Sequence, residues 1–255
     1  MTTSLLRLPT IPPLFAPEPA SRSCTMPLRR LREGRLVDGE DLVAVEAELR
    51  VRVQNGPDAI LSRTPGDDLN LVVGHLFCAG LIEGPGEVER IGFSCRAPSR
   101  ADVILHGSPV IRPVPELPAA RIEPEGLFRL KEVFERRQNL FRNTGSTHAA
   151  ALFSLDGRLF SFGEDVGRHN AFDKAVGRAL LEGTLGRAAI AMLSSRIAAE
   201  MAGKAARAGI PVLCGFSAAT TSGVAVALER GITLVGRLRG RSFDVYANAW
   251  RLTEA

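Results

Sequence analysis

The stretch AAIAMLSSRIAAEMAGKAARAGIPVLCG, residues 188–215, contains the pattern that decides the fold. It opens with a continuous apolar run, residues 188–193, which is typical of a central strand. Residues 196–208 follow with a helical pattern that Gly209 ends, and residues 211–215 form a second apolar run. Alternation of strand, helix and strand indicates a parallel sheet that is covered by helices.

The same alternation continues on both sides of this stretch. The predicted elements are a helix over residues 127–142, a hairpin of residues 149–154 and 158–163, helices over residues 170–181 and 222–230, and a last strand over residues 232–236. We therefore expect an α/β domain over residues 122–255, with a mainly parallel sheet.

The first half of the chain has a different texture. Residues 28–121 contain short β-type segments around one helix, and residues 43–53 alternate apolar and charged side chains as a half-buried strand does. We expect the helix to begin after Thr64 as its cap and to stop at Gly80. The organisation predicted for this half is a disordered Pro-rich lead-in, residues 1–27, and a smaller β-rich part, residues 28–121.

The overall composition is that of a globular protein. Of its 255 residues, 45% are hydrophobic and 24% are charged, and the net charge of +4 is too small to indicate nucleic-acid binding. No apolar stretch approaches the roughly 18 residues of a membrane span. The first residues lack the basic start and the apolar run of a secretory signal, so we expect a cytoplasmic protein.

The four cysteines are not arranged as a zinc or redox motif. Cys24, Cys78, Cys95 and Cys214 include no pair at Cys-x-x-Cys spacing. Cys78 and Cys214 lie in apolar surroundings, which favours two small buried side chains over two reactive thiols.

A polar turn between a predicted strand and a predicted helix is the first candidate site. Residues 215–223 contain four hydroxyl side chains where the first amides of a helix lack partners. A helix cap needs only one of these hydroxyls, so the turn favours a site for a phosphate or another anion.

Two further segments contain polar side chains at the ends of predicted strands. Residues 164–174 contain an acid pair, followed by Arg168, His169 and Lys174 around a helix start. His148 begins a predicted strand, where a lone histidine is more often structural than catalytic. Because residues 164–174 also lie where a strand meets a helix, we expect them to line the same cleft as the polar turn.

Four blocks of sequence together resemble the signature of the FdhD/NarQ family of formate dehydrogenase accessory sulfurtransferases. They are Thr144-Gly-Ser-Thr-His-Ala-Ala-Ala, Glu164-Asp-Val-Gly-Arg-His-Asn-Ala-Phe-Asp-Lys, Ser194-Ser-Arg-Ile-Ala-Ala-Glu and Gly209-Ile-Pro-Val-Leu-Cys-Gly-Phe-Ser-Ala-Ala-Thr. The resemblance extends from about residue 64 to residue 246. It implies a cytidine-deaminase-like fold for the C-terminal domain and a cytoplasmic homodimer.

The resemblance also implies a reaction and its partners. Members of the family accept sulfur from a cysteine desulfurase as a cysteine persulfide. They pass it to the bis(molybdopterin guanine dinucleotide) molybdenum cofactor, which formate dehydrogenase or a related molybdoenzyme then receives. The residues that this implies for cofactor binding are Phe216, Ser217, Ala218, Ala219, Thr220 and Thr221, with Arg168, His169 and Lys174 as neighbours.

The chain departs from the family where the family carries its sulfur. The Cys-Gly-x-Cys-Gly loop of the family corresponds to residues 106–121, which contain no cysteine, and a persulfide requires a thiolate. The family's Ser-Ala-Pro-Thr is Ser217-Ala-Ala-Thr in this chain. Cys95, beside Arg96, is a weak substitute as the carrier. The alternative is a non-catalytic chaperone that binds the molybdenum cofactor or a guanine nucleotide.

Two other enzyme classes suit parts of the pattern less well. A zinc deaminase needs His-x-Glu and Pro-Cys-x-x-Cys, whereas His148 is followed by Ala149 and Ala150 and no such cysteine pair exists, so no metal site is predicted. A serine hydrolase would use Ser217 in a nucleophile elbow, but the elbow's last glycine is Ala219.

Overall fold

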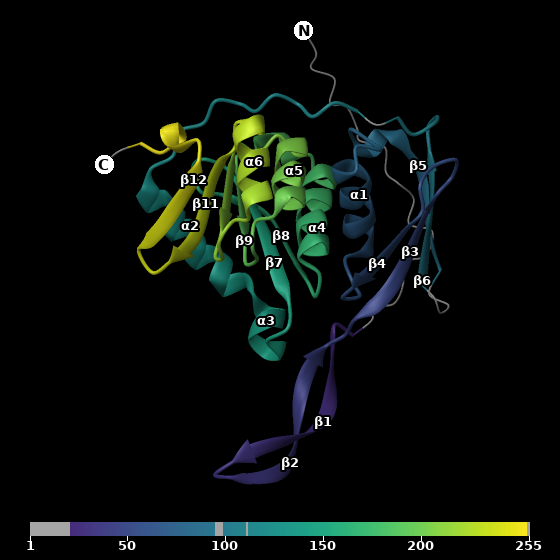
Figure 1. The fold of residues 1–255 in the computed structure, drawn as a ribbon. Coiled ribbons are helices and arrows are strands. Elements are labelled where there is room, and N and C mark those ends of the chain that lie inside the picture. The colour runs from purple at the N-terminus through teal and green to yellow at the C-terminus, as the bar shows by residue number, and fades with distance from the viewer. Residues whose placement is uncertain (1–20, 95–98, 111, 254–255) are drawn as a thin grey trace.

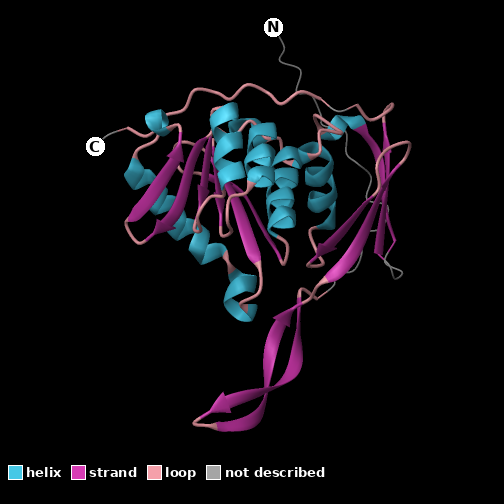
Figure 2. Ribbon diagram, in the orientation of Figure 1, coloured by secondary structure: helices cyan, strands magenta, loops and turns pink. Residues whose placement is uncertain are grey.

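The computed structural model of the chain describes residues 21–94, 99–110 and 112–253 (Figure 1). These residues form two sheets, a group of helices and a projecting hairpin (Figure 2). None of the helices in these ranges combines the length and the apolar character that a membrane span requires. Cys95 lies outside the described residues.

The larger sheet has six strands in the order β12-β11-β10-β9-β7-β8. Their bounds are β7 (His148–Phe153), β8 (Leu159–Asp165), β9 (Ile190–Leu193), β10 (Val212–Gly215), β11 (Thr233–Arg239) and β12 (Ser242–Ala247). Only β9, β10 and β11 run parallel, and the other three neighbouring pairs are antiparallel. The prediction of a mainly parallel sheet was therefore wrong, because short turns join β7 to β8 and β11 to β12 and such turns connect only antiparallel strands.

Helices cover both faces of this sheet. One face packs against α4 (Arg168–Leu181), α5 (Ala199–Arg207) and α6 (Thr221–Arg230), and the other packs against α2 (Pro124–Arg137). The single helix predicted over residues 127–142 is interrupted at Gln138, after which α3 (Asn139–Thr144) begins. The cause is tertiary, because the Glu164 carboxylate accepts hydrogen bonds from the first amides of α3.

The smaller sheet confirms the expected β-rich character of the first half. Its strand order is β4-β3-β6-β5, and α1 (Asp68–Cys78) packs on it. The strands are β3 (Ala47–Val53), β4 (Ala59–Arg63), β5 (Val88–Ser94) and β6 (Ser99–Leu105). Three 3₁₀ turns, η1 (Pro85–Glu87), η2 (Leu185–Arg187) and η3 (Ala249–Arg251), complete the described elements. Thr64 is not the cap of α1, because its hydroxyl accepts from the amide of Val166.

A two-stranded hairpin projects from the molecule. It consists of β1 (Ser23–Arg32) and β2 (Arg35–Ala44), which are drawn in purple in Figure 1. The predicted lead-in, residues 1–27, therefore extends too far, since β1 already begins at Ser23. The predicted strand over residues 43–53 is also divided, because the chain passes from the hairpin into β3 at residues 45–46.

The two sheets share one hydrophobic core through a close crossing of α1 and α4. A Cβ atom added at Gly74 would lie 1.9 Å from the Asp173 carbonyl oxygen, and one added at Gly177 would lie 1.9 Å from that of Asn70. Glycine thus lets the two helix backbones touch. The core that results includes side chains of β3, α1, α4 and β9, so the two predicted regions do not have separate interiors.

Residues 106–110 and 112–121, between β6 and α2, run as an extended segment across one end of the molecule (Figure 1). Arg207, the last residue of α5, donates hydrogen bonds to the carbonyl oxygens of Arg112 and Pro113. Since strand ends and helix starts of the larger sheet meet at the other end of α5, this segment lies opposite that edge.

Candidate functional site

The polar segments of the sequence meet at one edge of the larger sheet. His148 begins β7 opposite Asp165, the last residue of β8, and Gly215 at the end of β10 pairs with Leu193 at the end of β9. Ser194 follows β9, and its hydroxyl accepts from the amide of Ala149. The structure therefore brings together the three segments that the sequence singled out, at the edge where α/β proteins bind ligands.

The turn between β10 and α6 is held in place by its backbone. The amide of Phe216 donates to Leu193 O, the amide of Thr220 donates to Ile197 O, and Ala218 O accepts from the amide of Ile197. Thr220 is the helix cap, because its hydroxyl accepts from the amide of Gly223. Helix geometry leaves the amides of Thr221 and Ser222 without intrahelical partners. The turn therefore presents free donors to an anion.

The side chains of this turn divide into two groups. The ring of Phe216 packs on the α2 face of the sheet, with its centroid 5.0 Å from that of Phe134. Thr221 and Ser222 are exposed at the start of α6. The exposed hydroxyl groups that a ligand could contact are therefore at the helix start, whereas the ring of Phe216 packs in the core.

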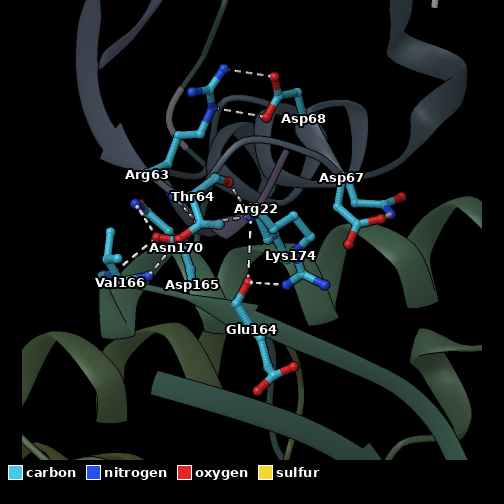
Figure 3. A network of polar contacts seen from close by, with 12 residues as sticks. Arg22, Arg63, Thr64, Asp67, Asp68, Glu164, Asp165, Val166, Asn170 and Lys174 are labelled. Atoms are coloured by element: carbon cyan, nitrogen blue, oxygen red, sulfur yellow. Dashed lines mark hydrogen bonds and ion pairs between the residues drawn. The ribbon is translucent and has the colours of Figure 1, made fainter. Parts of the chain in front are cut away.

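Lys174 does not reach the site. Only 1% of its side chain is exposed, and its Nζ lies 2.7 Å from Asp165 Oδ2 and 2.8 Å from Thr64 O (Figure 3). Burial lowers the pKa of Lys174, and the Asp165 carboxylate opposes that shift. Asp165 also accepts from the amide of Gly167 and from the side chain of Asn170. Contrary to our expectation, Lys174 is thus a buried structural residue without access to a cofactor.

Other charges of the segment 164–174 are structural as well. Glu164 is buried and caps α3 through both carboxylate oxygens. Asp173 lies with both oxygens 2.6 Å from Lys204 Nζ. Burial opposes the ionisation of Asp173, but Lys204 and His75 nevertheless lower its pKa. Among the ionisable side chains of this segment, only those of Arg168 and His169 remain partly exposed at the sheet edge.

His169 and His148 share an electropositive environment. His169 Nε2 lies 2.6 Å from the exposed Glu200 carboxylate, and His148 Nδ1 lies 3.4 Å from Ser194 Oγ. Burial, Arg168 and Arg196 lower the pKa of His148, and burial and Arg168 lower that of His169. Both rings therefore tend to be neutral at a pH near 7.

Arg196 and Ser194 are site residues that the sequence reasoning did not select. Both lie in the loop between β9 and α5, which has the same strand-to-helix position as the turn after β10. This shared strand-to-helix position could have identified the loop after β9 as part of the site. The Ser194 hydroxyl contacts the His148 ring, and the charge of the exposed Arg196 side chain helps to lower the pKa of that ring.

The cysteines that the structure describes differ in reactivity. Burial raises the pKa of Cys214 to about 12, and burial and Asp173 raise that of Cys78 well above its ordinary value. Both are poor thiolates, as their apolar sequence context predicted. Cys24 is exposed on β1. It is the only exposed free cysteine among the described residues.

Comparison with known proteins identifies the family of this chain. The sequence model of the FdhD/NarQ family matches residues 95–253. Relatives named "Sulfur carrier protein FdhD" from Streptomyces avermitilis and Sulfolobus acidocaldarius are 35% and 36% identical, each over 88% of this chain and over 93% and 96% of their own lengths. The relative from Mycobacterium tuberculosis is 32% identical over 89% of this chain.

A solved structure has the same fold. It is the crystal structure of a protein provisionally assigned as a formate dehydrogenase accessory protein from Desulfotalea psychrophila. It covers 91% of this chain with a TM-score of 0.80 and 25% sequence identity. With the match of the family's sequence model and the relatives at more than 30% identity, these findings show that the chain belongs to the FdhD/NarQ family.

Proposed function

We propose that this protein is a formate dehydrogenase accessory protein that binds the guanine dinucleotide end of the bis(molybdopterin guanine dinucleotide) molybdenum cofactor. The observation that carries the proposal is the turn of residues 216–221, whose free helix amides and hydroxyls lie at the same edge of the larger sheet as Arg168 and His169. Such a turn suits the diphosphate of a dinucleotide. The names of the relatives and of the solved structure support the accessory role.

Sulfur transfer is the second part of the proposed function. By analogy with relatives named as sulfur carriers, a cysteine desulfurase would supply the sulfur to a cysteine of this chain. The segment that replaces the family's cysteine loop contains no cysteine and is anchored by Arg207 at the end of the molecule opposite the turn. Cys78 and Cys214 are poor thiolates, which leaves Cys24 and Cys95 as thiols to test.

Three finer expectations belong to the same proposal. We propose that the protein acts in the cytoplasm and serves formate dehydrogenase or a related molybdoenzyme. We propose that it is a homodimer, which light scattering during size-exclusion chromatography would establish. We also propose that its α/β part is cytidine-deaminase-like, although it lacks the zinc ligands of a deaminase.

Nucleotide binding tests the first part of the proposal. The full chain is titrated with GDP as a stand-in for the guanine end of the cofactor, and binding is measured by calorimetry. Thr221→Val removes one exposed hydroxyl at the helix start and should weaken GDP binding about threefold to tenfold, the effect of one hydrogen bond. Thr25→Val, on the projecting hairpin, is the matched control and should leave binding unchanged. Equal affinity in both variants would argue against the turn as the binding site.

Persulfide mapping tests the second part. The protein is incubated with a cysteine desulfurase and cysteine, trapped with an alkylating agent and mapped by mass spectrometry. A persulfide on Cys95 or Cys24 that the corresponding serine variant abolishes would support a relocated carrier. Intact GDP binding without any persulfide would instead support the alternative function, a cofactor-binding chaperone without sulfur transfer.

A further inference from the structure

Among the described residues, two arginines at the sheet edge have no acidic partner. Within residues 21–94, 99–110 and 112–253, no carboxylate oxygen lies within 4.0 Å of the guanidinium nitrogens of Arg168 or Arg196. The Nε of Arg168 is also buried without a hydrogen-bond partner among the described residues. A buried donor without a partner costs free energy, which a ligand atom would relieve. These arginines are therefore available to an anion.

The backbone arranges these cations in a row. The loop that contains Arg196 is hydrogen-bonded on one side to the start of β7, through Ser194, and on the other side to residues 218–220. Arg168 is the first residue of α4, a helix of 14 residues whose positive dipole end points to the same edge. Arg196 thus lies between the start of β7 and the turn before α6.

His148 completes the row with a donor of defined orientation. Ser194 Oγ accepts from the amide of Ala149, so its own hydroxyl hydrogen is free to donate to His148 Nδ1, 3.4 Å away. That arrangement places the proton of a neutral ring on Nε2, where it can be donated to a ligand. The exposed carboxylate of Glu200 contacts His169 and not Arg168 or Arg196. The group of Arg168, Arg196 and His148 therefore keeps a net positive charge.

We propose that Arg168, Arg196 and His148 form a second anion subsite, which binds a phosphate group of a diphosphate ester. The inference rests on the proposed function in one respect: the diphosphate would belong to the nucleotide whose other contacts are made by the turn of residues 216–221. Arginine forks form two parallel hydrogen bonds to phosphate oxygens, and His148 donates a further one.

Calorimetry with inorganic pyrophosphate, guanosine and GDP tests the subsite in the full chain. Arg196→Gln should weaken binding of pyrophosphate and of GDP by about tenfold to a hundredfold, the effect of charge-assisted hydrogen bonds, and should leave guanosine binding unchanged. Arg168→Gln should do the same. The Nε of Arg168 is buried, so the circular dichroism of the Arg168→Gln variant must match that of the unmodified protein to show that the variant is folded. Arg100→Gln, which removes an exposed arginine of the other sheet that is paired with Asp102, is the matched control.

A second readout does not depend on affinity. Pyrophosphate at the subsite should raise the pKa of His148, followed by NMR of the ring, because a nearby anion favours the protonated form. An unchanged His148 pKa at saturating pyrophosphate, or equal pyrophosphate affinity in Arg196→Gln, would overturn the subsite.

The outcomes separate this inference from the proposed function. GDP binding that requires Thr221 but neither arginine would leave the proposed function standing without the subsite. Pyrophosphate binding that requires the arginines, in a protein that does not bind guanosine or GDP, would support the subsite and contradict the guanine-nucleotide function.

Discussion

At the scale of single residues, the most polar segment of the chain has mainly a structural role. Asp165 is fully buried and lies at the centre of contacts from Lys174, Thr64, Gly167 and Asn170 (Figure 3). A buried pair of this kind requires both partners, because the removal of one leaves an uncompensated charge. The same residues therefore position Arg168 by fixing the start of α4.

Lys174→Met should destabilise the protein strongly. The substitution leaves the Asp165 carboxylate buried without its cation, which typically costs about 3–5 kcal/mol in the free energy of unfolding. Urea denaturation measures this change. The double variant Lys174→Met with Asp165→Asn should recover part of the loss, since the orphaned charge is gone. A loss below about 1 kcal/mol in the single variant would show that the pair is not a structural ion pair.

The two histidines of the site should make stability depend on pH. Burial and Arg168 lower the pKa of both His148 and His169, and Arg196 adds to the shift of His148. The histidines of the unfolded chain have pKa values of about 6.5, so at a pH just below that value the unfolded chain binds more protons than the folded chain. The free energy of unfolding should therefore fall as the pH decreases below about 6.5. Above that pH both states hold neutral histidines, and these two residues should not change the stability. Urea denaturation between about pH 5 and 8 tests the sign, and His148→Asn should flatten the dependence. Stability that increases on acidification would contradict the shifts.

At the scale of elements, the decisive contact is the crossing of α1 and α4. Gly74 and Gly177 allow the backbone of each helix to touch the other, and the two helices then connect the core of one sheet with that of the other. The same crossing brings Thr64 to Lys174, so the packing of α1 and the buried charge network form together.

Gly177→Ala should destabilise the protein by about 1–3 kcal/mol or more. The new methyl group would lie 1.9 Å from the Asn70 carbonyl oxygen, and rigid backbone on both sides leaves no easy relaxation. Thermal and urea denaturation measure the effect. Gly203→Ala in α5 is the matched control, because the added Cβ would have no described atom within 4 Å apart from the backbone of its own helix. It should be stabilising by about 0.5–1 kcal/mol. Equal effects of the two substitutions would show that the helices do not touch at Gly177.

At the scale of the whole molecule, the two sheets should behave as one folding unit. Their shared core contains Leu49 and Val103 of the smaller sheet together with Leu193 and Leu213 of the larger one. The hairpin β1–β2 is different, since most of its residues are exposed and a lone hairpin is marginally stable.

Hydrogen exchange should reveal this cooperativity. We expect the amides of β3 and β10 to exchange with the same free energy of opening, close to that of global unfolding, because neither core half is complete without the other. The amides at the tip of β1 and β2 should exchange much faster. Protection of β10 that persists while β3 opens would show that the larger sheet folds on its own.

Local sequence patterns predicted several helices and strands and the hydroxyl-rich turn. Apolar runs and glycine stops predicted β9, β10, α5 and α6 nearly at their observed bounds, because these signals act within a few residues. The hydroxyl-rich turn before α6 and the four blocks that resemble the family are likewise short runs of consecutive residues, which can be recognised without the tertiary structure. Cys95, the weak carrier candidate, lies outside the described residues and stays a prediction.

Which polar residues are buried and which are accessible at the sheet edge depends on contacts between distant parts of the chain. Lys174 and Arg168 are indistinguishable as cations in the sequence, yet the first is buried against Asp165 while the second has no acidic partner within 4.0 Å among the described residues. Arg196 belongs to the site because β9 lies between β7 and β10 in the sheet. The interruption of the helix at Gln138 and the antiparallel strands at both ends of the sheet have the same origin, since contacts between distant residues set them and no local pattern records such contacts.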